Sequence, residues 1–259
     1  MQALDRRKKE IMLFIKTSTN ALISEIFDKN WENVLFILKA YPEEAKSFHT
    51  GVTFNGIHTS RLLALHHACT QNPPLNVIKA LIRAYPKAVQ ARDSYYRRLP
   101  IHFACLKKAS AEVIHELLEA YPGGASITAS LGRLPLHYAC ATGASKEVID
   151  AIVMVYSDSV LHRDINGWLP IHLACLQNVD SSLVARLLEL YPESIFVKTK
   201  KGNTPALCMN SVPDCSNKAE ILSLLENLGE KLNKLHVAIK SSLAPMKLSM
   251  FSVEAGVLC

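Results

Sequence analysis

Apolar residues recur along the chain at the three- and four-residue spacing that is typical of amphipathic helices. Four segments share one pattern, a helix of about ten residues that ends at a tyrosine followed by proline or serine. Proline disfavours the α conformation of the residue before it, so each Tyr-Pro pair predicts a helix end. The apolar residues of these four helices are Val77, Ile78, Leu81 and Ile82; Val113, Ile114, Leu117 and Leu118; Val148, Ile149, Ile152 and Val153; and Leu183, Val184, Leu187 and Leu188.

A short apolar phrase, Leu-Pro-Ile-His-Leu-Ala-Cys at 169–175, precedes the last of these helices and recurs before the others. Close copies lie at 99–105 and 134–140, a looser copy at 63–69 and a decayed one from Thr204, so the steps between copies are 36, 35, 35 and 35 residues. Proline after leucine favours the first turn of a helix. A fixed period of this size predicts stacked units, each with a short first helix and a longer second helix.

The segments that join one unit to the next are irregular and contain turn-forming glycines at Gly132, Gly167 and Gly202. Tyr41-Pro42 precedes Tyr85-Pro86 by 44 residues, so we expect an insertion of about nine residues between Tyr41 and Leu63. The Gly-containing polar run at 49–60 is its expected position.

The pattern divides the chain into four parts. Residues 1–19 form a charged lead-in, and residues 20–229 form an array of about six units with degenerate ends. Gly229 is expected to end the last second helix, so that 230–241 forms a separate C-terminal capping helix on a monomer. The tail, 242–259, has no clear period, and we expect part of it to be disordered.

An alternative for the C-terminal region is a heptad seam. Six apolar residues alternate steps of four and three, which is typical of a coiled coil, and a continuous helix over them would let the chain form an oligomer. A glycine inside a helix costs about 1 kcal/mol, which favours the two-helix cap. The seam residues are Ile221, Leu225, Leu228, Leu232, Leu235 and Ile239.

Histidine and cysteine recur three residues apart in four copies of the phrase, at His66 and Cys69, His102 and Cys105, His137 and Cys140, and His172 and Cys175. Such a pair suggests a metal site or a nucleophile with its base. Because the pair appears four times in equivalent settings, we interpret it instead as structural, with histidines bonded to the backbone and free, buried thiols. The sequence contains no phosphate loop, HExxH or CxxC pattern, so we expect no enzyme, no metal and no cofactor.

Composition adds little to this picture. The 259 residues include 29 Lys and Arg against 23 Asp and Glu, a net charge of +6 that permits an acidic partner. No apolar run is long enough for a membrane span, and the start lacks a signal-peptide core. We therefore expect an intracellular protein, cytoplasmic or nuclear.

The phrase is similar to the T-P-L-H-x-A motif of ankyrin repeats, with leucine in place of threonine, and Asp164 to Gly167 resembles the D-x-x-G turn of that family. The chain departs from the family in its period, in its Tyr-Pro helix ends and in that leucine. The resemblance implies an all-α, ankyrin-type helical repeat solenoid, in which helix-turn-helix units are joined by projecting turns. It also implies a non-catalytic scaffold or adaptor that binds a protein or peptide partner in a concave groove.

In the ankyrin arrangement, the projecting turns and the ends of the first helices line that groove. The corresponding positions vary from unit to unit here, and they include Tyr, Trp and Arg, the residue types that are enriched at binding hot spots. We expect these side chains to be exposed and available to a partner. The alternative is that Tyr95 or Trp168 packs against a neighbouring turn and that the arginines are only solvated. The candidate partner-binding residues are Tyr95, Tyr96, Arg97, Arg98, Lys107, Arg133, Thr142, Asn166, Trp168 and Gln177.

Nucleic-acid binding is the second hypothesis. The net positive charge and the run Tyr95-Tyr96-Arg97-Arg98, in which aromatic and basic residues are adjacent, favour it. A structural oligomer built through the heptad seam is the third.

Overall fold

The structure, a computed structural model, describes residues 21–52, 59–177, 179–213 and 216–251, so the predicted lead-in at 1–19 lies outside the described residues. The described part is mostly helical, which confirms the all-α class at that level. Its α-helices follow one another as six pairs: α2 (Ala21–Phe27) and α3 (Trp31–Ala40), α4 (Ala64–Thr70) and α5 (Leu75–Ala84), α6 (Pro100–Leu106) and α7 (Ala111–Ala120), α8 (Pro135–Thr142) and α9 (Lys146–Val155), α10 (Pro170–Leu176) and α11 (Ser181–Leu190), and α12 (Pro205–Asn210) and α13 (Lys218–Phe251).

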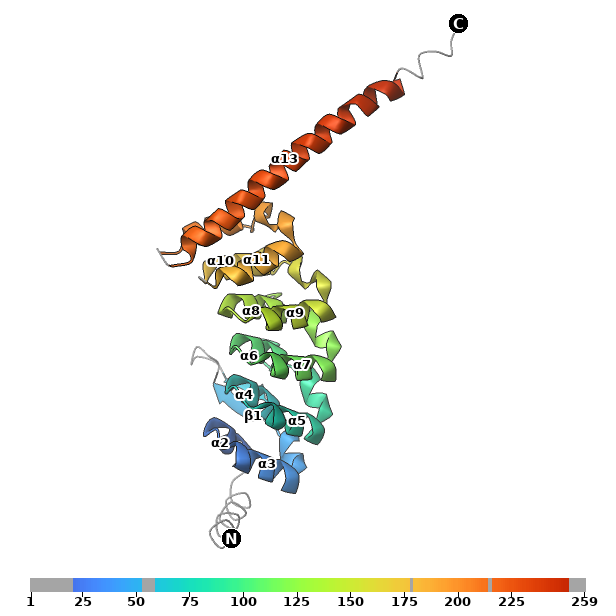
Figure 1. Cartoon of the computed structure of the whole chain (residues 1–259). Coiled ribbons are helices and arrows are strands. Elements are labelled where there is room, and N and C mark those ends of the chain that lie inside the picture. The colour runs from blue at the N-terminus through green and yellow to red at the C-terminus, as the bar shows by residue number, and fades with distance from the viewer. Residues whose placement is uncertain (1–20, 53–58, 178, 214–215, 252–259) are drawn as a thin grey trace.

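The pairs are stacked in chain order (Figure 1). The first helices contact one another in the order α2, α4, α6, α8, α10 and α12, and the second helices in the order α3, α5, α7, α9, α11 and α13. The core lies between these two rows. It consists of the apolar face predicted for each second helix together with the Leu, Ala and Cys residues of each phrase.

The predicted helix ends at tyrosine are confirmed. Tyr85, Tyr121 and Tyr191 each follow the last residue of a second helix, and their backbone N–H groups donate to the carbonyl oxygen four residues earlier. Tyr156 does the same although serine follows it. A short 3₁₀ helix comes next in each unit: η1 (Pro42–Lys46), η2 (Pro86–Gln90), η3 (Pro122–Ser126), η4 (Ser157–Val160) and η5 (Pro192–Phe196).

The insertion expected between Tyr41 and Leu63 contains an antiparallel hairpin. Its strands are β1 (His49–Val52) and β2 (Thr59–Leu62), with His49 opposite Leu62 and Val52 opposite Thr59. The polar run therefore lies where the period placed it. Its pairing as strands was not predicted, because its residues show no alternation of apolar and polar positions.

The C-terminal prediction is wrong at two boundaries. Helix α13 runs without interruption from Lys218 to Phe251, so Gly229 does not end a helix and 230–241 is not a separate one. The helix also continues past residue 242, and the rest of the predicted tail, 252–259, lies outside the described residues. Its first turns pack on α11, α12 and η5, and the helix then extends away from the stack (Figure 1). No helix within the described ranges is both long and apolar enough to cross a bilayer.

Candidate partner-binding surface

The histidine of each phrase is part of the structural frame. The Nδ1 atom of His102 accepts the backbone N–H of Leu99 at 3.0 Å, and its Nε2 atom lies 3.1 Å from the carbonyl oxygen of Ile127. His66, His137 and His172 make the same pair of contacts with their own leucine and with a carbonyl in the segment that follows the next second helix. The expectation that these histidines bind backbone groups is confirmed.

This geometry fixes the protonation state of the rings. An Nδ1 atom that accepts a hydrogen bond carries no proton, so Nε2–H donates to the carbonyl and the ring is neutral. Burial disfavours the charged form and lowers the pKa of His66 and His137 to about 4 and that of His102 to about 3. Among the described residues, no group of three or more His, Cys, Asp or Glu side chains could hold a metal ion.

The cysteines of the phrases are free thiols in the core. Cys69, Cys105, Cys140 and Cys175 are buried and unpaired, as the sequence predicts. Burial raises the pKa of Cys105 and Cys175 to about 12, so these groups remain protonated thiols at neutral pH. A protonated, enclosed thiol is neither a nucleophile nor a metal ligand, and it serves as a small apolar group.

Four turns connect successive helix pairs, at residues 93–98, 129–133, 164–168 and 199–203, and we refer to them together as the turn row. Two of them are closed by a buried aspartate at their first position. The carboxylate of Asp93 accepts the backbone N–H groups of Tyr96 and Arg98, at 2.9 and 2.6 Å. Asp164 likewise accepts those of Asn166 and Trp168, at 2.8 and 3.0 Å.

Neighbouring turns are joined through their backbones. The N–H group of Ser130 donates to the carbonyl oxygen of Tyr96 at 2.8 Å, that of Ile165 to Leu131 at 3.1 Å, and that of Lys200 to Asn166 at 2.9 Å. Each turn is thereby fixed relative to the next. The side chains at the tips therefore project from turns that are hydrogen-bonded to one another, not from independent loops.

The first turn differs from the others in backbone conformation. Gly132, Gly167 and Gly202 have positive φ angles of 69°, 76° and 83°, as expected of turn-forming glycines. The corresponding residue of the first turn is Arg97, with φ 58°. A side chain in this left-handed region costs about 1–2 kcal/mol, so the first turn retains an exposed arginine at an energetic cost.

Arg98 is buried, and the expectation that it is exposed is wrong. Its side chain is only 9% exposed. The guanidinium carbon lies 4.2 Å from the ring centre of Tyr96 and 5.1 Å from that of Tyr138, and Nε–H donates to the Tyr138 hydroxyl at 3.4 Å. Aromatic rings from two helix pairs enclose this cation, so Arg98 holds the units together.

Arg133 and Trp168 are half-buried, which corrects the expectation that both are exposed. Nε–H of Arg133 donates to the buried carboxylate of Asp164 at 3.0 Å and so links the second turn to the third. The indole of Trp168 packs on the core, with its ring centre 5.9 Å from that of His172. Both side chains therefore contribute to packing.

Thr142 is also part of the frame. Its hydroxyl lies 3.0 Å from the carbonyl oxygens of Tyr138 in its own helix and of Cys105 in the preceding pair. Lys107 is half-buried at the end of α6, and Gln177 is exposed at the end of α10. The ends of the first helices thus contribute less accessible surface than the resemblance implies.

The structure brings Tyr95, Tyr96 and Arg97 together at the tip of the first turn. The two tyrosine rings meet edge to face with centres 4.5 Å apart, Tyr95 is 41% exposed, and Arg97 is exposed beside them. Asn166 is exposed at the tip of the third turn. Of the predicted residues on the turn row, Tyr95, Arg97 and Asn166 are exposed, and the half-buried Tyr96 lies against Tyr95.

Several further exposed residues on the turn row, among them Leu131, Lys200 and Lys201, were absent from the prediction. Leu131 is 39% exposed at the second tip, and Lys200 and Lys201 are exposed at the fourth. The signal that could have found them is their position, two to four residues before the start of each phrase, which matches that of Tyr96 and Ile165. Ile165 itself is 51% exposed.

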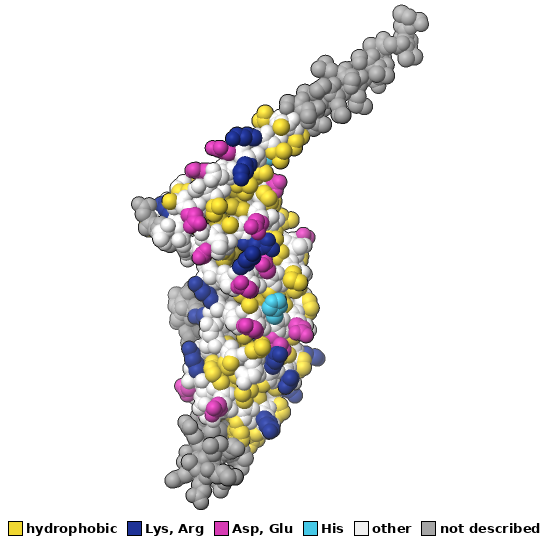
Figure 2. Space-filling view, in the orientation of Figure 1, with side chains coloured by type: hydrophobic (Ala, Val, Ile, Leu, Met, Phe, Trp, Pro, Cys, Tyr) yellow, Lys and Arg dark blue, Asp and Glu magenta, His cyan; other side chains and the backbone are white. Residues whose placement is uncertain are grey.

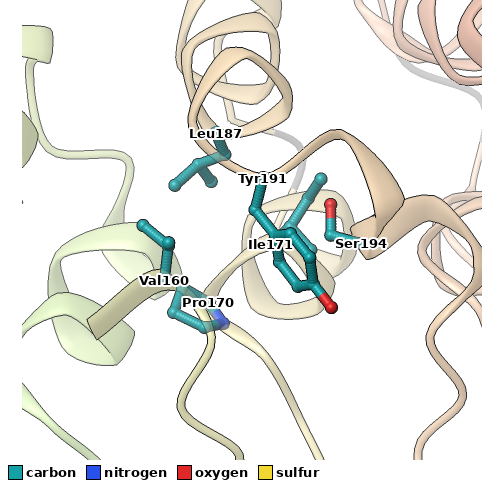
Figure 3. Close-up of a pocket in the computed structure, with 6 residues that line it drawn as sticks. All are labelled: Val160, Pro170, Ile171, Leu187, Tyr191 and Ser194. Atoms are coloured by element: carbon teal, nitrogen blue, oxygen red, sulfur yellow. The ribbon is translucent and has the colours of Figure 1, made fainter. Parts of the chain in front are cut away.

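A small pocket lies between η4, α10, α11 and η5 (Figure 3). Apolar side chains form most of its lining, and Tyr191 and Ser194 contribute the two hydroxyl groups. None of its six lining residues is a carboxylic acid, an imidazole or a thiol, so the pocket supplies neither an acid–base pair nor a metal ligand set. The lining residues are Val160, Pro170, Ile171, Leu187, Tyr191 and Ser194.

No family model matches the chain, and no curated protein is similar to it.

Proposed function

We propose that the chain is an ankyrin-type solenoid that binds another protein non-covalently through the turn row. One observation carries this proposal: the buried frame is the same in successive units, whereas the exposed tips of the turns differ. Closing the turn does not require a different exposed residue in each unit. Variable side chains on a rigid, repeated support are what a recognition surface requires.

The arrangement of the helices supports the ankyrin assignment. The two rows of helices, the phrase at the start of each first helix and the glycines in the projecting turns agree with the resemblance. The neutral histidines and protonated thiols support a non-catalytic role, because four successive units use them in the same way, to satisfy backbone groups and to fill the core. A scaffold or adaptor is the function that fits these features.

The test is to substitute exposed tips without disturbing the frame. Ile165→Lys and Asn166→Arg should each weaken binding of a purified partner by about 1–3 kcal/mol, while the thermal midpoint stays within the error of the wild type. Met154→Lys is the matched control, because Met154 is 87% exposed on α9, on the opposite row of helices. Unchanged affinity in both tip variants, measured by calorimetry, would move the binding site elsewhere on the molecule.

A second candidate function is self-association through α13. The observation that favours it is the unbroken helix, which places all six seam residues on one helix. Ile221 and Leu225 are buried against the last units, whereas Leu235 is 54% exposed on the same seam. Figure 2 shows hydrophobic side chains on α13 where it extends beyond the stack.

This candidate and the predicted monomer exclude each other. A coiled-coil dimer would be detected by light scattering of the full chain, and Leu235→Asp would dissociate it while the helix pairs remain folded. Asn233→Asp, at an exposed position off the seam, is the matched control. A wild-type mass equal to one chain at high protein concentration would eliminate the dimer.

A further inference from the structure

Charge is divided unequally between the two sides of the stack. The turns, first helices and adjoining loops at 59–70, 91–110, 126–145, 161–180 and 197–212 contain eleven Lys and Arg residues but three acidic ones. The second helices with their 3₁₀ helices, at 75–90, 111–125, 146–160 and 181–196, contain five Lys and Arg against eight acidic residues. The side that carries the turn row is therefore the basic side.

The three acidic residues do little to reduce this charge at the tips. Asp93 and Asp164 are buried, and their carboxylates bind backbone N–H groups of their own turns and, for Asp164, Arg133. Asp180 caps α11, at the end of the first helix away from the turn. The cations on the tips accordingly face solvent without exposed carboxylates in the same turns.

These cations lie at the two ends of the turn row. Arg97 is exposed in the first turn. Arg61 of β2 is also exposed near this turn, because its backbone N–H donates to Ser94 Oγ at 2.9 Å, and its guanidinium carbon lies 4.9 Å from the ring centre of Phe48. Lys200 and Lys201 are exposed in the fourth turn. An anionic ligand that spans the row would meet positive charge at both ends.

The two central turns present an apolar surface instead. Leu131 and Ile165 are exposed there on hydrogen-bonded backbones, and the side chain of Ile165 lies over Gly132. A Cβ atom at Gly132 would come within 3.1 Å of Ile165 Cγ2, so this glycine permits the close approach of the two turns. The remaining charges of these turns, Arg133 and Asp164, pair with each other.

We propose that the turn row binds an extended polypeptide segment with acidic residues at both ends and apolar residues between them. This inference rests on the proposed function and specifies the partner. Stacked helices lie about 8–10 Å apart, so three steps from the first turn to the fourth span roughly 24–30 Å. An extended chain covers that distance in about eight or nine residues.

A nucleic acid fits this pattern less well. Its backbone carries one negative charge at every nucleotide, so charges would face the two central turns, where aliphatic side chains project. Single-stranded nucleic acids also bind through aromatic platforms, whereas the exposed tyrosine of the turn row lies at one end. A segment of alternating chemistry matches the basic, apolar and basic order of the tips.

The experiment uses the full chain and a fluorescent eleven-residue peptide. The peptide has two glutamates at each end, and its seven central positions are filled by Leu, Ile and Val. Anisotropy titrations should show binding that Lys200→Glu with Lys201→Glu weakens by about tenfold or more. Arg83→Glu with Lys87→Glu, the same change of charge on the opposite side, should leave it unchanged. A peptide with lysines at one end should restore binding to the turn variant.

Three results would overturn the inference. The first is equal binding of a peptide of the same composition with its glutamates in the centre. The second is equal loss of affinity in the turn variant and in the opposite-side control. The third is tighter binding of oligothymidylate that displaces the peptide, which would assign the surface to single-stranded nucleic acid.

A second arm separates this inference from the proposed function. A photo-crosslinking residue is placed at Asn166 or, as the control, at Met154, and the crosslinked segment of the cellular partner is sequenced by mass spectrometry. Crosslinks from position 166 to an acidic, apolar and acidic segment support both proposals. Crosslinks from 166 to another kind of segment overturn the inference alone, and crosslinks from 154 alone overturn both.

Discussion

In each unit the buried histidine and the tip of the preceding turn lie close together in the chain, yet the structure uses them in opposite ways. His102 binds Leu99 and Ile127 in the same geometry that His172 uses with Leu169 and Val197. At the tip position four residues before each phrase, the exposed residue changes from Tyr95 to Ser130, Ile165 and Lys200. The groups that stability requires are therefore the ones that repeat from unit to unit, whereas the groups available for recognition are exposed and vary.

The largest expected effect is a loss of folding stability at acidic pH, because the buried histidines must remain neutral in the folded chain. Burial lowers the pKa of His66 and His137 to about 4 and that of His102 to about 3, from the ordinary value of 6.5. His67, which is buried next to His66 in α4, also has its pKa lowered to about 4 by burial. Between pH 6.5 and about 4 the unfolded chain therefore binds up to four more protons than the folded one. The contribution of these neutral rings to the free energy of unfolding is fully present above pH 6.5. It falls as the pH drops below that value, by on the order of 1.4 kcal/mol per pH unit for each histidine.

Urea titrations at pH 7.5, 6.5, 5.5 and 5.0 measure this loss. His115→Gln, at an exposed position of α7, should leave the slope of stability against pH unchanged. An unfolding free energy that is the same at pH 7.5 and pH 5.0 would contradict the role assigned to the buried rings.

Removal of one histidine should have the next largest effect. His137→Ala leaves the N–H group of Leu134 without a partner and removes one of two hydrogen bonds to the carbonyl oxygen of Trp168, which also accepts the N–H of Asp164. The loss should cost about 1–3 kcal/mol of stability. Partner affinity at a temperature where the variant is folded should not change. A variant as stable as the wild type in urea would show that water replaces the ring at no cost.

The adjacent arginines give a sharper comparison, because one residue type serves both purposes. Arg98→Ala removes a guanidinium enclosed by the rings of Tyr96 and Tyr138 and should lower stability by about 1–2 kcal/mol. Arg97→Ala, one residue away and exposed, should change stability little and weaken partner binding. Equal thermal midpoints for the two variants would refute the distinction.

The smallest expected effect has the opposite sign. Arg97→Gly relieves a side chain at φ 58°, so it should raise stability by about 0.5–1 kcal/mol while weakening binding of an acidic segment. Lys108→Gly is the matched control, because Lys108 has φ 55° at the end of α6, away from the turn row. It should bring a similar gain in stability with no change in affinity.

Much of the frame was predictable from the sequence, because local chemistry determines it. The Tyr-Pro pairs end the second helices, the phrase prolines begin the first helices, and three glycines occupy the positive-φ positions. The recurrence of the histidines in equivalent settings led to the prediction that they bond to the backbone. Each of these features depends on contacts within one unit or with the next.

The errors concern side-chain direction and helix length, which depend on tertiary packing. Variation between units was taken as a sign of exposure, but Arg98 turns inward because Tyr138 of the next unit provides an aromatic face. Gly229 was taken as a helix end. Helix α13 continues through it because helix-forming residues flank it and because the buried Ile221 and Leu225 hold the preceding turns against the stack. The free-energy cost of the glycine is therefore offset by contacts that the identity of residue 229 alone does not predict.

The buried thiols allow the local opening of each helix pair to be measured. Cys69, Cys105, Cys140, Cys175 and Cys208 place one enclosed sulfur in each of five successive helix pairs. A thiol reagent can modify each sulfur only after its own pair opens, so five labelling rates in one native chain report five local opening equilibria. Mass spectrometry of the labelled peptides would order the pairs by the ease with which they fray, without a single substitution.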